Sequence, residues 1–214
     1  SKILKTGQEI TVDCSSGAEG KVYLGKIPFK VLTYKLEKIP RLKTKISINI
    51  GAPDIAFQTS FIPNDGVGLA REEFIIAEKI KIHPLALYRF NKLKDKKLKN
   101  LISQLTVEHK NKKEYFIKEL GEGIAQIAAA FYPKEVIVRF SDFKTNEYRQ
   151  LVGGQLFEPQ EENPMLGWRG ASRYYDKDFK PAFEMECLAM KRAIEELGLT
   201  NISVMVPFCR TLEE

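Results

Sequence analysis

Short apolar runs alternate with longer amphipathic segments along most of this chain, and this alternation limits the possible folds more than any other feature of the sequence. The run VIVRF (136–140) is apolar almost throughout, which is typical of strands that are covered on both faces in parallel sheets. The segment before it begins with a capping pattern at Asn111, spaces apolar residues such as Phe116 and Leu120 along one helical face, and ends at Pro133. A helix that leads directly into a buried strand indicates a parallel α/β fold.

The number of such runs indicates the size of the sheet. GVGLA runs directly into the helix-patterned REEFIIAEKI, and a largely apolar stripe predicts a long helix over 179–197. An eight-stranded βα barrel takes ~250 residues, so the 170 residues from Lys45 to Glu214 hold roughly five to six units. We therefore expect an α/β fold that is a partial (β/α)8 TIM barrel with about its first five strands. The strand candidates are KISINI (45–50), GVGLA (66–70), VIVRF (136–140), MLGWR (165–169) and ISVMVPF (202–208).

The two ends of the chain have patterns of their own. Residues 9–25 predict two short strands around a Ser/Gly-rich turn, because β-branched and tyrosine residues alternate with polar ones. We expect a small β unit over 1–30, a proline-containing linker over 31–44 and the barrel part over 45–214. Near the other end, Thr211 and Glu214 have the spacing of a capping box that opens a helix. We therefore expect the chain to be a piece of a longer polypeptide.

The charge balance favours anionic ligands. The 34 Lys and Arg residues exceed the 28 Asp and Glu residues, which gives a net charge of +6. Much of the excess lies in two lysine-rich runs, 89–100 and 109–113. These runs could bind nucleic acid or another polyanion, but aromatic residues that could stack on bases are scarce in them. Solvated helix faces explain the lysines better.

Cysteine spacing and hydropathy exclude several classes of protein. Cys14, Cys187 and Cys209 lie far apart without a CxxC pair, so the sequence favours a reducing compartment over a zinc site or a disulfide framework. The longest stretch with few charges, 124–132, is much shorter than the ~20 apolar residues that a bilayer crossing needs. We expect a soluble, cytoplasmic protein without a membrane partner.

Three arginines occupy equivalent places in the predicted fold. Arg71 follows GVGLA at once, Arg139 lies near the end of VIVRF, and Arg169 ends MLGWR. In a barrel, the carboxyl ends of the strands meet on one face, where functional sites are built. Guanidinium groups present paired N–H donors that match carboxylate or phosphate oxygens, so the cluster predicts a small anionic substrate. Any one of these arginines taken alone is more often part of a structural ion pair.

Four stretches carry a family resemblance: IPNDGVGLAREEFIIAEKIKIHPLAL, VIVRFSDFKTNEYRQLVGG, ENPMLGWRGASRYY and MVPFCRTLEE. They resemble the PEP-utilising enzymes, and within that family the phosphoenolpyruvate synthases (pyruvate, water dikinases), across essentially the whole chain. The resemblance implies an ATP-grasp domain, a swivelling phosphohistidine domain and a C-terminal barrel that binds pyruvate or phosphoenolpyruvate. Residues 11–25 resemble the closing hairpin of the swivelling domain, and those from about 45 onward resemble the first half of the barrel.

The resemblance also implies roles for individual residues. Arg71 in GVGLAR and Arg139 in VRFSD match the two arginines that contact substrate in this family, where they would neutralise charge on the transferred phosphoryl group. For Arg169 and Arg173 in GWRGASR, packing or ion-pair roles are favoured over substrate contact. Asp142 is expected to buttress a neighbouring arginine, because a single carboxylate makes a poor magnesium site.

The rest of the implied chemistry falls outside this chain. Neither His83 nor His109 lies in a Gly/Thr/Ser-rich segment like the one that carries the family's phosphorylated histidine. The Mg²⁺ ligands and the proton-donating cysteine belong to later strands of the family barrel, so Cys209 is expected to be a bystander thiol. ATP would be bound by a domain that is absent here. We therefore expect no catalytic residue and no metal ligand in this chain, and no activity of the chain alone.

The implied reaction converts ATP, pyruvate and water to AMP, phosphate and phosphoenolpyruvate through a phosphohistidine carrier. This chain would supply the arginines of the pyruvate/phosphoenolpyruvate site in a protein that we expect to be a homodimer at full length. Two alternatives stay open. One is the sister enzyme pyruvate phosphate dikinase, which uses phosphate in place of water, and the other is a basic module that binds nucleic acid or another polyanion.

Overall fold

The computed structural model describes residues 4–15, 20–33, 40, 42–212 and 214. The chain divides into two compact units, residues 1–41 and residues 42–214. In the first unit, β1 (Ile10–Asp13) and β2 (Lys21–Leu24) pair antiparallel, which confirms the two strands predicted within 9–25. The Thr11 hydroxyl donates to the carbonyl of Gly25 at 2.7 Å and fastens the end of this pair. The turn at 16–19 lies outside the described residues, and the assignment of 1–30 to a swivelling domain stays a prediction.

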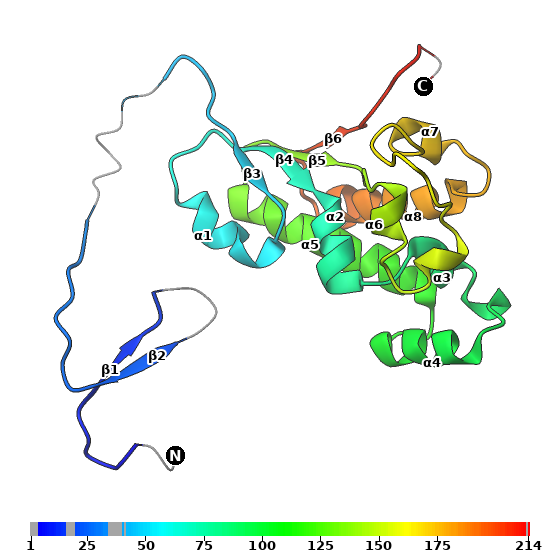
Figure 1. Ribbon diagram of the computed structural model, residues 1–214. Coiled ribbons are helices and arrows are strands. Elements are labelled where there is room, and N and C mark those ends of the chain that lie inside the picture. Colours follow the sequence, from blue (N-terminus) through cyan, green and yellow to red (C-terminus); the bar gives the residue numbers. More distant parts are fainter. Residues whose placement is uncertain (1–3, 16–19, 34–39, 41, 213) are drawn as a thin grey trace. The chain divides into compact units, whose positions relative to one another are not determined.

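The second unit is built on a parallel sheet, as the sequence predicts (Figure 1). Its strands lie in the order β3-β4-β5-β6, and every neighbouring pair is parallel. The partial (β/α)8 barrel stays a prediction. The strands are β3 (Ile48–Ile50), β4 (Val67–Arg71), β5 (Val136–Arg139) and β6 (Ile202–Met205).

The fifth strand candidate, MLGWR (165–169), is wrong. The segment is an irregular loop, because its backbone bonds to nearby side chains instead of to a strand. The Trp168 N–H donates to Glu161 Oε1 at 2.9 Å, and the Met165 N–H donates to Asn163 Oδ1 at 3.2 Å. A Cβ at Gly167 would come within 2.1 Å of Glu161 Oε2, so the loop closes tightly around that carboxylate.

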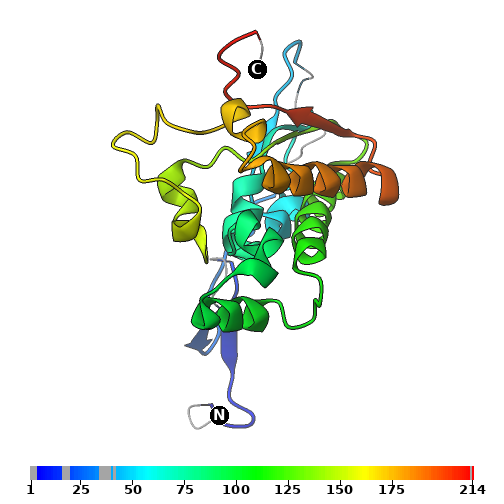
Figure 2. The same cartoon turned by 90° about the vertical axis from the view of Figure 1, so that its right-hand side faces the viewer.

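Two long helices pack on one side of the sheet, and both confirm the predicted segments (Figures 1 and 2). α5 (Lys112–Phe131) begins where Asn111 Oδ1 accepts the N–H groups of Lys113 and Glu114. α8 (Lys180–Lys191) continues as the π-helical turn η6 (Arg192–Glu196). At Gly121 of α5 a Cβ would lie 2.9 Å from the Ala189 carbonyl, so this glycine permits close contact with α8. The buried residues between these helices and the sheet form the core.

Shorter elements connect the strands and long helices. The predicted helix after GVGLA is present as α2 (Glu72–Phe74) and η3 (Ile75–Ile80), and the chain beyond β6 has no regular element within the described residues. There, Thr211 Oγ1 accepts the N–H of Glu214 at 3.3 Å, which is one hydrogen bond of the predicted capping box. The shorter elements are η2 (Pro53–Ile55), α1 (Ala56–Ser60), α2 (Glu72–Phe74), η3 (Ile75–Ile80), α3 (Pro84–Tyr88), η4 (Phe90–Lys92), α4 (Lys96–Leu105), α6 (Thr145–Tyr148), η5 (Gly154–Leu156) and α7 (Ala171–Tyr174).

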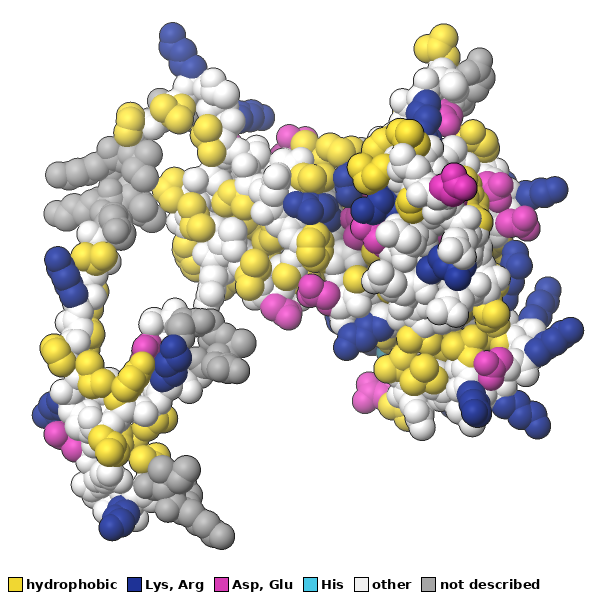
Figure 3. Space-filling model, viewed as in Figure 1, with side chains coloured by type: hydrophobic (Ala, Val, Ile, Leu, Met, Phe, Trp, Pro, Cys, Tyr) yellow, Lys and Arg dark blue, Asp and Glu magenta, His cyan; other side chains and the backbone are white. Residues whose placement is uncertain are grey.

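The first lysine-rich run, 89–100, covers η4 and the first half of α4. Asp95 caps α4 by accepting hydrogen bonds from the N–H groups of Lys97 and Leu98. Ile102 is buried on the inner face of this helix. Lys94 is exposed ahead of the helix, and Figure 3 shows Lys and Arg side chains standing outward in this region. Among the described residues, no helix combines the length and apolarity that a bilayer crossing requires.

Candidate functional site

The carboxyl ends of β4 and β5 bring the two predicted site arginines side by side. Arg71 and Arg139 are Cα partners in the parallel ladder between these strands. Because successive side chains of a strand point to opposite faces, Arg139 points away from the core into which Val138 is buried. Arg71 and Arg139 line one pocket of 630 Å³.

Arg139 is held by two carboxylates within this pocket. Its Nη2 donates to Glu73 Oε1 at 2.6 Å, and its Nη1 lies 3.3 Å from Asp142 Oδ2. Glu73 Oε1 also accepts the backbone N–H of Asp142 at 2.7 Å. The guanidinium is therefore fixed in direction before any ligand arrives, and much of its charge is compensated.

Arg169 lies in the same pocket but is fully engaged by Asp142. The contact is bidentate, with Nε–Oδ1 at 2.9 Å and Nη2–Oδ2 at 2.8 Å. The hydrogen bonds that Arg169 donates to Asp142 raise the pKa of Arg169 and keep it charged. Its guanidinium also stacks 4.2 Å from the Phe208 ring, beyond β6. Asp142 thus buttresses both arginines, which confirms the predicted role of Asp142 and the predicted ion pair of Arg169.

Arg71 differs from its neighbours because no carboxylate of the described chain lies within ion-pair distance of it. Its guanidinium packs over the Phe74 ring at 5.3 Å. The pocket lining contains four basic side chains and three acidic ones, and Lys144 is paired with Glu147 at 3.0 Å. The remaining uncompensated charge is that of Arg71. An anion that enters the pocket therefore meets one free guanidinium beside a rigidly held one.

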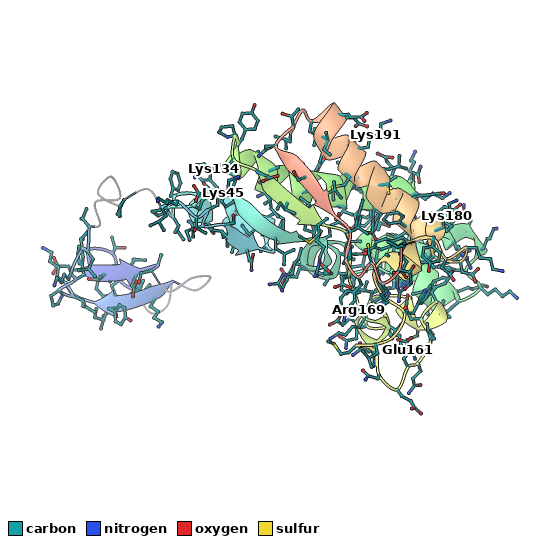
Figure 4. The ribbon with its side chains drawn as sticks, turned by 90° about the horizontal axis from the view of Figure 1, so that it is seen from above. Lys45, Lys134, Glu161, Arg169, Lys180 and Lys191 are labelled. Carbon is teal, nitrogen blue, oxygen red and sulfur yellow. The ribbon has the colours of Figure 1, made fainter. Side chains whose placement is uncertain are left out.

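Arg173 belongs to a separate, fully buried cluster. Its Nη1 and Nη2 donate to Glu158 at 2.6 and 2.8 Å, and the guanidinium stacks 4.0 Å from the Trp168 ring. This confirms the predicted ion-pair and packing role. The cluster ties the loop that carries Glu161 and Arg169, both labelled in Figure 4, to the body of the fold.

His83 completes the same cluster as a neutral side chain. Its Nδ1 accepts the Leu85 N–H at 3.2 Å, so the ring proton is on Nε2 and is donated to Glu158 Oε1 at 2.9 Å. Burial lowers the pKa of His83. Burial would raise the pKa of Glu158, but the hydrogen bonds from His83 and Arg173 lower it overall. His83 is therefore a structural residue of this cluster.

Several residues of this region are absent from the sequence-based prediction. Glu73 holds Arg139 from 66 positions away, and Ser141 binds Glu186 across 45 positions, so neither contact has a local signal. One signal existed for Glu186. It interrupts an otherwise apolar helical stripe, and an acid in that position must be buried with a partner.

The pocket does not offer a metal site. Within the described ranges, no three His, Cys, Asp or Glu side chains gather so that they could hold a metal ion. Glu73 Oε1 and both oxygens of Asp142 are occupied by guanidinium and amide donors, whereas Glu73 Oε2 has no donor among the described residues. These residues do not fit Mg²⁺, which prefers several oxygen ligands in octahedral geometry.

Comparisons with known proteins identify one family and relatives that all carry the same enzyme name. The family described as PEP-utilising enzyme, PEP-binding domain, matches residues 30–214. The chain is 53% identical to the phosphoenolpyruvate synthase of Aquifex aeolicus, with 99% of this chain and 30% of that protein covered. It is 53% identical to that of Synechocystis (99% and 26% covered) and 47% identical to that of Escherichia coli (99% and 26% covered). The chain therefore spans about a quarter to a third of these relatives.

Proposed function

The chain belongs to the PEP-utilising enzyme family, and on that premise we propose that it supplies part of the pyruvate/phosphoenolpyruvate site of a phosphoenolpyruvate synthase. In the proposed reaction, ATP, pyruvate and water yield AMP, phosphate and phosphoenolpyruvate. One observation carries the proposal. Arg71 and Arg139 are register partners at the carboxyl ends of β4 and β5, and both face one pocket.

The two guanidiniums have different tasks in this proposal. Arg71 has a free hydrogen-bonding edge, so it binds the ligand anion and supplies the uncompensated positive charge. Arg139 is oriented by Glu73 and Asp142, and it presents an already positioned donor to the phosphoryl oxygens. Donors fixed before the reaction need no reorganisation as charge develops, which is the main way proteins assist phosphoryl transfer.

The transfer moves a phosphoryl group from a histidine nitrogen to the enol oxygen of pyruvate, so a P–N bond breaks and a P–O bond forms. This chain's part is limited to binding and orientation. The phosphohistidine, the ATP site and the Mg²⁺ that the family resemblance implies are assigned to parts of the protein beyond these residues.

Substitution of Arg139 in the full-length protein tests the proposal. Arg139→Ala is expected to abolish phosphoenolpyruvate formation while ATP-dependent histidine phosphorylation continues. Arg89→Ala is a matched control, because Arg89 is 38% exposed and lies on a different part of the fold. Normal turnover by Arg139→Ala would refute the assignment.

Pyruvate phosphate dikinase is the alternative, and its requirement for phosphate in place of water distinguishes it from a phosphoenolpyruvate synthase. The relatives from Aquifex aeolicus, Synechocystis and Escherichia coli are named phosphoenolpyruvate synthases, which favours water over phosphate as the second acceptor. Turnover that needs added inorganic phosphate would support pyruvate phosphate dikinase instead.

A further inference from the structure

A second polar cluster adjoins the pocket through neighbouring residues. Glu72 lies between the pocket residues Arg71 and Glu73, at the start of α2. Glu186 lies in α8, and Ser141 directly precedes the pocket residue Asp142. Both glutamates are completely buried, with 0% of their surface exposed. The proposed reaction uses neither carboxyl group.

Every polar group of Ser141 is held by a side chain of this cluster. Its N–H and its hydroxyl donate to Glu186 at 3.3 and 2.7 Å. Its carbonyl accepts the Tyr174 hydroxyl at 2.6 Å. Its Oγ lies 2.8 Å from the Tyr148 hydroxyl, which must be the donor because the Ser141 proton is given to Glu186. Burial raises the pKa of Tyr148 and keeps that phenol protonated.

The hydrogen bonds also indicate where a proton lies between the two acids. Burial raises the pKa of Glu186, but the two hydrogen bonds that it accepts from Ser141 oppose this rise and favour its ionised form. If Glu72 were ionised, neither of its oxygens would have a donor among the described residues. A proton on Glu72, donated to Glu186, gives Glu72 a partner and leaves a single negative charge on the two acids. Consistent with this, burial, the charge of Glu186 and a hydrogen bond to it raise the pKa of Glu72 well above its usual value.

We propose that Glu72 and Glu186 share one proton, and that this acid–carboxylate pair holds the turn after β5 in the conformation that presents Arg139 and Asp142 to the ligand. The proposed function enters only as the identity of that ligand. Glu72 and Glu186 are positioning residues here, because they act through Ser141 and do not line the pocket.

The path from the pair to the pocket is short. Glu186 fixes the Ser141 N–H, and Glu73 fixes the next N–H, that of Asp142, at 2.7 Å. The Asp142 carboxylate then pairs with Arg139 and Arg169. Loss of the shared proton would leave two buried negative charges in contact, with Glu73 as a third nearby, and their repulsion would displace this turn.

Titratable groups of the elements that pack around Glu72 and Glu186 act on this pair of acids. Arg139 of β5 and Arg173 of α7 favour its negative charge, whereas Glu73 of α2 opposes it. The remaining groups are Tyr148 of α6, Tyr174 of α7 and Cys187 of α8, whose own pKa values are raised by burial and then by Glu186. The raised pKa values keep Tyr148, Tyr174 and Cys187 uncharged near neutral pH, so these three groups do not mimic the pair.

The pH dependence of pyruvate affinity in the full-length protein tests the proposal. Pyruvate stays ionised from about pH 7 to about pH 10, so a change of affinity there reports on the protein. Wild-type affinity is expected to fall with rising pH, approaching tenfold per pH unit as the proton leaves. Glu72→Gln is expected to be flat over the same range, because the amide is neutral and can still donate to Glu186. Glu184 is an exposed acid of α8, the helix that carries Glu186, and it offers a control. Glu184→Gln should keep the wild-type dependence of affinity on pH.

Infrared difference spectroscopy gives a readout that does not depend on activity or on the ligand. Wild type should show a protonated carboxyl band that is lost on alkaline titration and is missing in Glu72→Gln. Absence of that band, or identical affinity profiles in wild type and Glu72→Gln, would overturn the proposal. Failure of wild type to bind pyruvate at any pH would contradict the proposed function alone, and the infrared titration would then decide the pair. If Glu72→Gln does not fold, the wild-type titration decides it.

Discussion

Arg71 and Arg139 are partners in the β4–β5 register, but only Arg139 is held by carboxylates. The pocket thus joins a fixed guanidinium with a free one. This difference separates the expected effects of substituting each arginine.

Arg71→Ala should weaken binding and leave stability nearly unchanged. A charged hydrogen bond contributes about 1.5–3 kcal/mol, so affinity for pyruvate or phosphoenolpyruvate should fall by roughly tenfold to a hundredfold. Because Arg71 has no ion pair within the described chain, the thermal unfolding midpoint should hardly change. Calorimetric titration and thermal unfolding measure the two effects. Equal affinity in wild type and Arg71→Ala would remove Arg71 from the site.

Glu73 should affect turnover through Arg139. Glu73→Ala removes the ion pair and leaves the Asp142 N–H without its acceptor, at a cost of about 1–3 kcal/mol in unfolding free energy. Glu73→Gln keeps an acceptor for that N–H and should be less destabilised. Both variants should lower kcat by a larger factor than they raise KM, because Glu73 orients Arg139 and does not bind the ligand anion. A change in KM alone would contradict this role.

Substitution of Arg173 should lower the stability of the fold and make the loop that carries Glu161 and Arg169 more mobile. Removing one partner of a buried ion pair costs about 3–5 kcal/mol, so Arg173→Met should lower the free energy of unfolding by that order. Hydrogen exchange should increase in the loop that carries Glu161 and Arg169. The double variant Arg173→Met/Glu158→Met removes both charges and should recover part of the loss. If the double variant is no more stable than Arg173→Met, the loss of unfolding free energy comes from packing around Arg173 and not from the unpaired charge of Glu158.

The buried acids should make stability fall as pH rises. Their folded pKa values lie above the unfolded value of 4.5, with burial raising that of Glu186 to about 7. The stability they contribute is therefore complete below about pH 4.5 and is lost as the pH rises through each raised pKa, which for Glu186 is about 7. Glu72→Gln removes its share of this loss, so its advantage over wild type should grow with pH, by at most about 1.4 kcal/mol per pH unit. Denaturant unfolding at several pH values measures it, and a constant difference would contradict the assignment.

Local patterns were sufficient to predict most of the second unit. The apolar run at 136–140 and the capped stripe from Asn111 correspond to β5 and α5 because their burial repeats with the period of each element. MLGWR has a strand-like composition, but its conformation depends on Glu161, which accepts the Trp168 N–H. That interaction depends on tertiary folding, so composition alone predicted the wrong structure.

The candidate site was predictable only in part. Arginines at strand ends could be recognised because parallel strands align their carboxyl ends. The carboxylates that hold them come from distant positions, and nothing in the sequence near Arg139 identifies Glu73 as its partner. The difference between a compensated Arg139 and a free Arg71 therefore required the structure.

Single-turnover discharge of the phosphohistidine is the most direct test that these two arginines serve the acceptor site. The full-length protein, phosphorylated from ATP and freed of nucleotide, is mixed with pyruvate, and loss of phosphohistidine is followed together with formation of phosphoenolpyruvate. Arg71→Ala and Arg139→Ala should both become phosphorylated like wild type and then retain the phosphoryl group after pyruvate is added. Discharge to phosphoenolpyruvate at the wild-type rate in either variant would contradict the account.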